Sequence, residues 1–233
     1  EAAPAPLLGW DRDGIDVDLP RLGRSRVGLR GRHQAANVAV ADAVLDALDD
    51  AGIARTDDAA RRRGYAEATW PGRLELLRAG GRDVLLDGAH NPAGAAALAV
   101  ALDDLRPMLE GGGETAPPPL TLVVASMRDK DVDGVIRALA TSTALRGARV
   151  IATSLDLPRA LPAAMLAARW RAVGAAAGIA AVAAVRDAGA AIARAIETAR
   201  GPVVVAGSLY LVGEARRRLV DDPRLRDPED EGE

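Results

Sequence analysis

The hydrophobic pattern changes near residue 70 and divides the chain into two parts. Up to Arg32, short alternating segments broken by Gly and Pro indicate the end of a β-rich region. From His33 to Ala51, apolar residues recur at helical spacing and stop before Gly52, a common residue at helix ends. A second, polar helix is predicted from Asp57 to Ala68. The segment Trp70-Pro71-Gly72 interrupts the pattern, and we place a domain boundary there.

Beyond this boundary, strands alternate with helices. The pattern predicts a β-hairpin from an alternating segment at Arg73–Arg78, a Gly80-Gly81 turn and an apolar run at Asp83–Asp87. Short buried strands are predicted at Leu120–Ser126, Arg149–Ser154, Val182–Val185 and Val203–Ala206. Helices are predicted at Ala93–Leu109, Val132–Leu145, Ala163–Val173 and Ala188–Ala199. This alternation predicts an α/β fold with a Rossmann-like, mainly parallel sheet and helices on both faces.

The composition is that of a globular protein and narrows the classes of function. Of the 233 residues, 49% are apolar and 27% are charged. The net charge of −3 argues against a nucleic-acid partner, because neutralising phosphates requires a basic excess. The absence of cysteine excludes disulfides, thiolate nucleophiles and Cys-ligated metals. No apolar run reaches the roughly 18 residues of a membrane span. We therefore expect a cytoplasmic protein that does not bind membranes. Residues 221–233 are acidic and interrupted by Pro, so we expect a loose tail there.

The strongest local signal for chemistry follows the apolar run of the predicted hairpin. The sequence Asp87-Gly88-Ala89-His90-Asn91-Pro92 joins the end of a buried strand to the start of a helix. Functional groups in parallel sheets gather at the carboxyl ends of strands, and helix N-termini attract anions. Asp87, His90 and Asn91 are therefore placed to meet a phosphorylated ligand. The alternative is that Asp87 and Asn91 only cap the helix and that His90 is an ordinary loop residue.

Five blocks along the chain carry a resemblance to a known family. They are Gly31-Arg32-His33-Gln34-Ala35-Ala36-Asn37, Trp70-Pro71-Gly72-Arg73-Leu74-Glu75, Asp87-Gly88-Ala89-His90-Asn91-Pro92, Asp129-Lys130-Asp131 and Gly207-Ser208-Leu209-Tyr210-Leu211-Val212-Gly213-Glu214. In this order and spacing, they resemble folylpolyglutamate synthase/dihydrofolate synthase and its relatives among the Mur ligases. The resemblance covers nearly the whole chain and implies that the second part is the carboxyl-terminal domain of a Mur ligase.

The resemblance implies an ATP-dependent and Mg²⁺-dependent ligase. Such an enzyme phosphorylates a folate or dihydropteroate carboxylate, and the amino group of L-glutamate then attacks the acyl phosphate to form an amide. In the family, ATP lies between the central and the carboxyl-terminal domains. Catalysis would rest on positioning and on neutralising phosphate charge.

The resemblance also assigns roles to single residues. Asn37, Arg73 and Asp87 match residues that contact the nucleotide: Asn37 through its amide, Arg73 at the phosphates and Asp87 through ribose hydroxyls. The alternatives are that Asn37 only bonds the backbone at the helix N-terminus and that Arg73 is an ordinary surface arginine on a strand. His90 matches a histidine near the phosphates, with a purely structural role as its alternative.

Residues of the later blocks have open alternatives. Lys130 belongs to the catalytic set that the resemblance implies. The alternative is a local ion-pair cluster with Asp129 and Asp131, which is the more common role of a lysine flanked by two aspartates. Ser208 and Tyr210 could shape the glutamate or folate pocket or serve packing. Arg159 is a candidate for binding the carboxylate of the incoming amino acid.

The phosphate loop that such ligases need is missing from the sequence. No G-x-x-x-x-G-K-[ST] motif is present, and Asp129 precedes the single lysine, Lys130. We therefore interpret residues 1–69 as the carboxyl-terminal remnant of a central ATP-binding domain and 70–233 as a whole carboxyl-terminal domain. We expect the metal ligands in an absent amino-terminal part, so this chain is predicted to hold no metal and to be inactive alone. The start at Glu1, without Met, fits this interpretation.

Three other readings stay open. The chain could belong to another Mur-type amino-acid ligase, to a nucleotide-binding α/β module without catalysis, or to a structural domain without a ligand. The sequence does not distinguish folylpolyglutamate from dihydrofolate synthesis. We expect a monomer, because no large exposed apolar stripe is evident.

Overall fold

The computed structural model describes residues 3–113 and 115–222, and the chain divides into two units. Unit 1 ends at Arg73 and unit 2 begins at Leu74. The division therefore follows the Trp70-Pro71-Gly72 segment, four residues after the predicted end at residue 69 (73 against 69).

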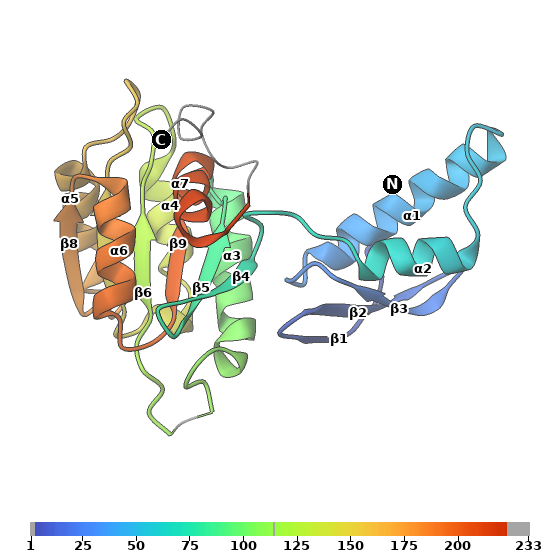
Figure 1. Ribbon diagram of the computed structural model, residues 1–233, viewed down its shortest axis with the longest axis horizontal. Helices are drawn as coiled ribbons and strands as arrows, with labels where there is room; N and C mark the ends of the chain where they lie inside the picture. Colours follow the sequence, from blue (N-terminus) through green and yellow to red (C-terminus); the bar gives the residue numbers. More distant parts are fainter. Residues whose placement is uncertain (1–2, 114, 223–233) are drawn as a thin grey trace. The chain divides into compact units, whose positions relative to one another are not determined.

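Unit 1 consists of a three-stranded antiparallel sheet and two helices (Figure 1). Its elements are β1 (Leu7–Asp11), β2 (Gly14–Leu19), β3 (Gly23–Val27), α1 (Gln34–Asp50) and α2 (Asp58–Ala66). Alternate residues of β2 are buried, and Ile15, Val17 and Leu19 form a small core with Ala35 and Val38 of α1. The predicted β-rich start and both predicted helices are confirmed.

Unit 2 contains a six-stranded sheet in the order β4-β5-β9-β6-β7-β8. Its strands are β4 (Glu75–Ala79), β5 (Arg82–Asp87), β6 (Thr121–Val124), β7 (Arg149–Thr153), β8 (Ala181–Val185) and β9 (Val203–Ala206). The β4–β5 pair is the predicted hairpin and is antiparallel, whereas the other neighbouring strands are parallel. The predicted mainly parallel α/β sheet is confirmed.

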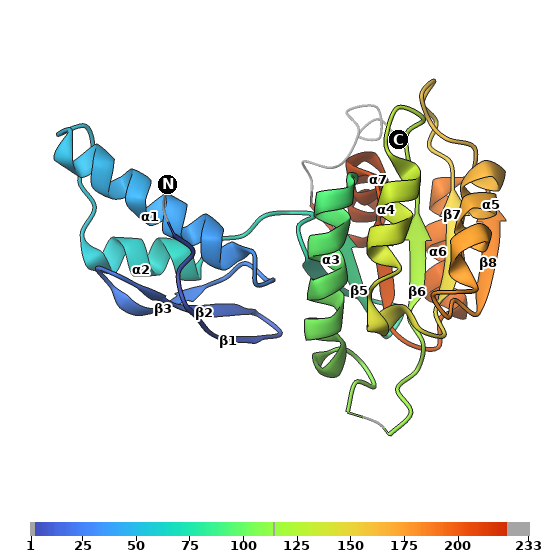
Figure 2. The ribbon, with the colours of Figure 1, turned by 180° about the vertical axis from the view of Figure 1, so that it is seen from behind.

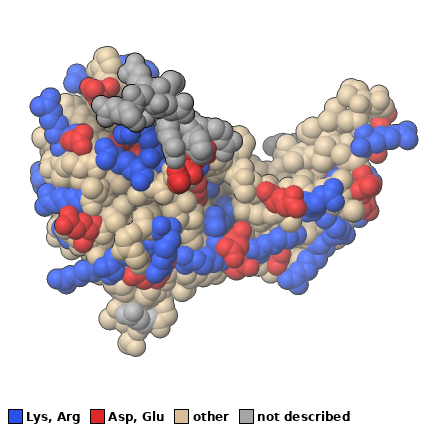
Figure 3. All heavy atoms as spheres, viewed as in Figure 1, with Lys and Arg blue, Asp and Glu red and all other residues tan. Residues whose placement is uncertain are grey.

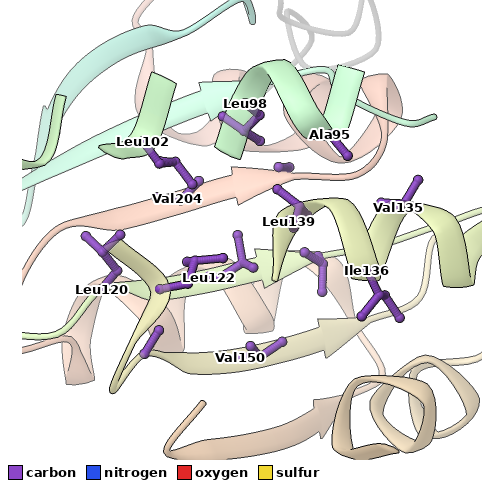
Figure 4. Close-up of a cluster of buried hydrophobic side chains, with 14 of the residues drawn as sticks. Ala95, Leu98, Leu102, Leu120, Leu122, Val135, Ile136, Leu139, Val150 and Val204 are labelled. Carbon is purple, nitrogen blue, oxygen red and sulfur yellow. The ribbon is translucent and has the colours of Figure 1, made fainter. Parts of the chain in front are cut away.

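Helices cover both faces of this sheet. They are α3 (Pro92–Leu105), α4 (Val132–Leu139), α5 (Ala163–Gly174), α6 (Ala188–Thr198) and α7 (Leu209–Leu219). Helices α3, α4 and α5 lie on one face, as Figure 2 shows, and α6 and α7 lie on the other (Figure 1). The larger core packs between α3, α4, α5 and the sheet, and Figure 4 shows Leu102 of α3 near Val204 of β9. Burial on both faces explains why β6, β7 and β9 are largely continuous apolar runs, whereas the edge strand β8 is partly exposed.

Helices α3 and α4 end earlier than the sequence predicts. The predicted helix at 132–145 ends at Leu139, and a separate 3₁₀ turn, η2, spans Thr143–Leu145. Asp103 of α3 causes this break, because its Oδ1 accepts hydrogen bonds from Ser142 Oγ (2.7 Å) and the backbone N–H of Ala144 (2.8 Å). A second 3₁₀ turn, η1 (Arg106–Met108), follows α3 directly.

Helix α7 was not among the predicted elements. Ser208 caps its N-terminus by accepting a hydrogen bond from the backbone N–H of Tyr210. Leu211, Val212 and Ala215 are buried on one side of the helix, and three arginines occupy its last turn. Of the predicted tail, only Asp221 and Asp222 lie within the described residues.

The parallel strands bring several loops to one edge of the sheet. Strands β5, β6, β7, β8 and β9 all end at this edge, because they run in the same direction. The loops that follow β5, β6 and β9 contain the Asp87–Pro92, Asp129–Asp131 and Gly207–Ser208 segments. On the face shown in Figure 3, basic and acidic side chains are interspersed over both units.

Candidate functional site

A pocket of about 160 Å³ lies at the carboxyl edge of the sheet in unit 2. We call it the edge pocket, and its lining residues are His90, Met127, Asp129, Lys130, Arg159, Gly207, Ser208, Leu209 and Tyr210. They come from the loops after β5, β6, β7 and β9 and from the first turn of α7. The structure therefore brings together His90, Lys130 and the three further candidates Arg159, Ser208 and Tyr210.

The His90 ring is fixed by its own loop. His90 Nδ1 lies 2.8 Å from the carbonyl oxygen of Gly88. A carbonyl oxygen only accepts, so Nδ1 carries the proton in this contact. In the neutral ring, the lone pair of Nε2 is then available for a ligand in the edge pocket. Such a nitrogen can accept a proton from an ammonium group.

Two cations line the edge pocket, and their environments differ. Arg159 Nη1 pairs with Asp129 Oδ2 at 3.2 Å. Both side chains are largely exposed, so this pair stabilises the loop only weakly. Among residues 3–113 and 115–222, no hydrogen bond or ion pair of the Lys130 ammonium is recorded. The alternative cluster of Lys130 with Asp129 and Asp131 is not found among these residues: Asp129 pairs with Arg159, and Asp131 caps α4 through the N–H of Gly134.

The floor of the edge pocket is formed where β9 turns into α7. Gly207 has φ +96°, and a Cβ there would lie 2.5 Å from the carbonyl oxygen of Ala125. Only glycine fits this turn without displacing the end of β6. Ser208 follows at 4% exposure, and Tyr210 is 60% exposed at the rim. Ser208 thus combines its capping role with a place in the pocket wall.

Asp87 and Asn91 organise the turn before α3. Asn91 Oδ1 caps this helix by accepting from the N–H of Gly94 at 2.8 Å, as the structural alternative predicted. Asp87 does not cap it: Oδ1 accepts from the N–H of Ala89 at 2.9 Å, and Oδ2 from the N–H of Leu74 at 3.0 Å. Asp87 does not line the edge pocket, and its contact with ribose stays a prediction.

Unit 1 contains a second pocket, of about 330 Å³, which we call the helix pocket. Its lining residues are Val27, Leu29, Gln34, Asn37, Val38, Ala41, Tyr65, Ala68, Trp70 and Arg73. Two predicted nucleotide-contacting residues, Asn37 and Arg73, are therefore brought together here. The guanidinium of Arg73 lies 5.1 Å from the centre of the Trp70 ring, a cation–π contact.

A chain of side-chain hydrogen bonds runs along the start of α1. Asn37 Nδ2 donates to Gln34 Oε1 at 2.8 Å, and Gln34 Nε2 lies 3.0 Å from His33 Nε2. Gln34 is buried at 1% exposure, whereas Asn37 is exposed. Gln34 and Trp70 were not predicted as site residues, although both lie in the blocks that carry the resemblance.

A buried ionic network supports the wall of the helix pocket. Arg61 of α2 pairs with Asp42 Oδ1 (3.0 Å) and Asp46 Oδ1 (2.7 Å) of α1. Asp42 Oδ1 also accepts a hydrogen bond from the Tyr65 hydroxyl at 2.8 Å. Burial raises the pKa of Tyr65 above its ordinary value, and the hydrogen bond to Asp42 raises it further. These contacts fix α2 on α1 and hold Tyr65 in the pocket wall.

A metal site was not expected in this chain. Among the described residues, no group of three or more His, Cys, Asp or Glu side chains could hold a metal ion. Within the same residues, no helix combines the length and apolar character of a membrane-crossing segment.

Comparison with known proteins decides the family. The model of the family "Mur ligase, glutamate ligase domain" matches residues 72–209. The chain belongs to the Mur ligase family. The match covers most of unit 2, including the loops that line the edge pocket, and it confirms the resemblance drawn from the sequence blocks.

Curated relatives are folate ligases. The chain is 44% identical over 115 residues to the dihydrofolate synthase/folylpolyglutamate synthase of Mycobacterium tuberculosis. This alignment covers 48% of the chain and 21% of the relative. It is 38% identical over 198 residues to a probable bifunctional folylpolyglutamate synthase/dihydropteroate synthase of Halobacterium salinarum. This second alignment covers 83% of the chain and 21% of the relative. These alignments span only about a fifth of each relative's length.

Solved structures extend the similarity to both units. A folylpolyglutamate synthase of M. tuberculosis complexed with ADP and AMPPCP has a TM-score of 0.74 and 31% identity, covering 96% of this chain and 49% of that one. The folylpolyglutamate synthase of Thermotoga maritima has a TM-score of 0.70 and 27% identity, covering 93% and 46%. This Mur ligase chain thus spans about half the length of these enzymes.

Proposed function

We propose that this Mur ligase chain is part of an ATP-dependent ligase that adds L-glutamate to a folate or dihydropteroate carboxylate through an acyl phosphate. The gathering of His90, Lys130, Arg159 and Ser208 around the edge pocket carries the proposal. The similarity to folate ligases over both units supports it, because it includes a structure with bound nucleotide. The ligase would act in the cytoplasm as a monomer.

The edge pocket offers what an incoming amino acid requires. The cationic groups of Lys130 and Arg159 match carboxylates of L-glutamate, and the hydroxyl of Ser208 adds a hydrogen-bonding group. The amino group of L-glutamate must lose a proton before it attacks the acyl phosphate. His90 Nε2 is placed to accept that proton, since Nδ1 is held by Gly88. We therefore propose that this pocket holds L-glutamate.

The helix pocket suits the nucleotide. Its aliphatic lining and the Trp70 ring fit the faces of a purine, and the amide of Asn37 fits a base edge. The Arg73 guanidinium, in contact with Trp70, can bind phosphate oxygens bidentately. Under this proposal, unit 1 is the remnant of a central ATP-binding domain. The ribose contact of Asp87 belongs to the same proposal.

Magnesium is assigned to no residue of this chain. The described residues provide no group of three or more His, Cys, Asp or Glu side chains that could hold the ion. The phosphate loop is likewise missing from the sequence. The proposal therefore requires that other protein segments supply both the loop and the metal ligands.

An incorporation assay tests the proposal. The protein encoded by the complete reading frame is incubated with ATP, Mg²⁺, radiolabelled L-glutamate and either tetrahydrofolate or dihydropteroate. We expect label in an amide product only when ATP is present, and no turnover by the 233-residue chain alone. Failure to label either acceptor would reject the folate ligase, and turnover by the chain alone would reject the requirement for a separate phosphate loop.

A further inference from the structure

The hydrogen bond between Gln34 and Asn37 restricts which side of the Asn37 amide a ligand can meet. An asparagine amide can rotate by 180° and exchange its donor and acceptor ends. Here Nδ2 donates to Gln34 Oε1 at 2.8 Å, which occupies one of its two N–H groups. Among residues 3–113 and 115–222, no hydrogen bond to Asn37 Oδ1 is recorded. Oδ1 and the second N–H of Nδ2 are therefore available to the helix pocket.

Both ends of the Gln34 amide have a partner in this structure. Its side chain is buried, so its polar atoms depend on protein partners. Gln34 Nε2 can only donate, and it lies 3.0 Å from His33 Nε2. When Nε2 of Gln34 donates in this contact, the neutral His33 ring accepts at Nε2 and carries its proton on Nδ1. A Gln34 amide turned the other way would place Nε2 toward Asn37, and Asn37 would then have to present its donor end to the pocket.

We infer that Gln34 is a positioning residue that makes the helix pocket selective for 6-aminopurines over 6-oxopurines. Adenine offers a donor at N6 and an acceptor at N7, which match Oδ1 and the second N–H of Asn37. A 6-oxopurine places an acceptor, O6, against Oδ1, and Asn37 cannot rotate without losing its bond to Gln34. This inference rests on the proposed nucleotide site but goes further, because it assigns base choice to a residue outside direct contact with the base.

Nucleotide titration of the isotope-labelled 233-residue chain tests this assignment. ADP and inosine diphosphate differ at position 6 of the base, and their dissociation constants follow from shifts of backbone and side-chain amide resonances. For the unsubstituted chain we expect ADP to bind about 5- to 30-fold more tightly, the scale of one matched against one mismatched hydrogen bond. Gln34→Leu should bring this ratio close to one, because Asn37 can then rotate.

Gln34→Glu is the matched control. Its carboxylate keeps an acceptor for Asn37 Nδ2, so the preference for ADP should persist. A purely structural role of Gln34 would weaken both nucleotides equally and leave their ratio unchanged in Gln34→Leu, which would overturn the inference but not the nucleotide site. Equal binding of both nucleotides by the unsubstituted chain would also overturn the inference alone. An absence of ADP binding would overturn the nucleotide site and the inference together.

Discussion

The backbone N–H of Leu74 donates a hydrogen bond to Asp87 Oδ2 at 3.0 Å. Leu74 is the first residue of unit 2, is 1% exposed and has φ +44°, a left-handed conformation that is uncommon for leucine. The bond joins the start of unit 2 to the end of β5. Asp87 therefore has a structural task, whatever it contributes to nucleotide binding.

Replacing Asp87 should separate these two roles. Asp87→Ala leaves the N–H of the buried Leu74 without this acceptor, which should lower the free energy of unfolding by about 1–3 kcal/mol. Asp87→Asn keeps one acceptor and should cost less. Urea unfolding followed by circular dichroism measures both, and an unchanged midpoint for Asp87→Ala would show that the bond contributes nothing.

Arg73→Ala should reduce ligase activity in the intact protein. Losing one charge-stabilising donor at the phosphates corresponds to roughly 10- to 1000-fold in rate, or about 1.4–4 kcal/mol. The incorporation assay measures the loss. Arg55→Ala is the control, because Arg55 is largely exposed and lies outside the helix pocket. A rate that stays the same in Arg73→Ala would remove Arg73 from the phosphate site.

Lys130→Met should weaken the binding of L-glutamate to the chain. We expect an affinity loss of about 5- to 30-fold, since a charge-assisted contact is replaced by an apolar chain of similar length. Isothermal titration calorimetry measures the dissociation constant. Arg137→Met removes an exposed cation of α4 outside the edge pocket and should have no effect. Equal losses in the two variants would point to general electrostatics instead of a site at Lys130.

Tyr65 should make the stability of the chain sensitive to alkaline pH. Burial, together with the bond to Asp42, raises the pKa of Tyr65 in the folded state. Protonated Tyr65 therefore contributes its full stabilisation at pH values below about 10, the pKa of tyrosine in the unfolded chain. This stabilisation is lost as the pH rises from there toward the pKa of Tyr65 in the folded state. Unfolding should therefore become easier above about pH 10.

Tyr65→Phe provides the comparison. This variant should be less stable at neutral pH by about 0.5–1.5 kcal/mol, the net value of one hydrogen bond, and should lose part of the alkaline sensitivity. Urea midpoints collected from pH 8 to 11 would reveal both effects. Identical pH profiles for the two proteins would exclude Tyr65 as the responsible group.

The sequence predicted the fold well because its apolar pattern is strong. Strands such as Val203–Ala206 are buried on both faces, and each is separated from the next by a helix. Helix α7 escaped prediction because Gly213 and the arginines of its last turn dilute a short apolar stripe. The early end of α4 depends on Asp103, which is distant in sequence, so no local pattern could reveal it.

The candidate site was only partly accessible to sequence reasoning. Loops after parallel strands meet at one edge of a sheet as a general rule, and His90 and Ser208 line one pocket there. The sequence had not grouped them, because it placed His90 near the phosphates and Ser208 near glutamate or folate. The partners of Asp87 and Asp129 were not foreseeable, because the backbone N–H of Leu74 and the guanidinium of Arg159 reach these carboxylates only in the folded chain. The Gln34–Asn37 hydrogen bond is a local contact between residues i and i+3. Its role in orienting Asn37 toward a ligand becomes visible only with the helix pocket, which both residues line.

The turn at Gly207 limits how the edge pocket can evolve. Any side chain at this position would meet the carbonyl oxygen of Ala125, and the φ of +96° would add backbone strain. A larger residue at the floor of the edge pocket would push the end of β9 away from the end of β6. Changes of ligand preference within this lineage should therefore accumulate in the loops that bear Lys130 and Arg159, while the glycine persists.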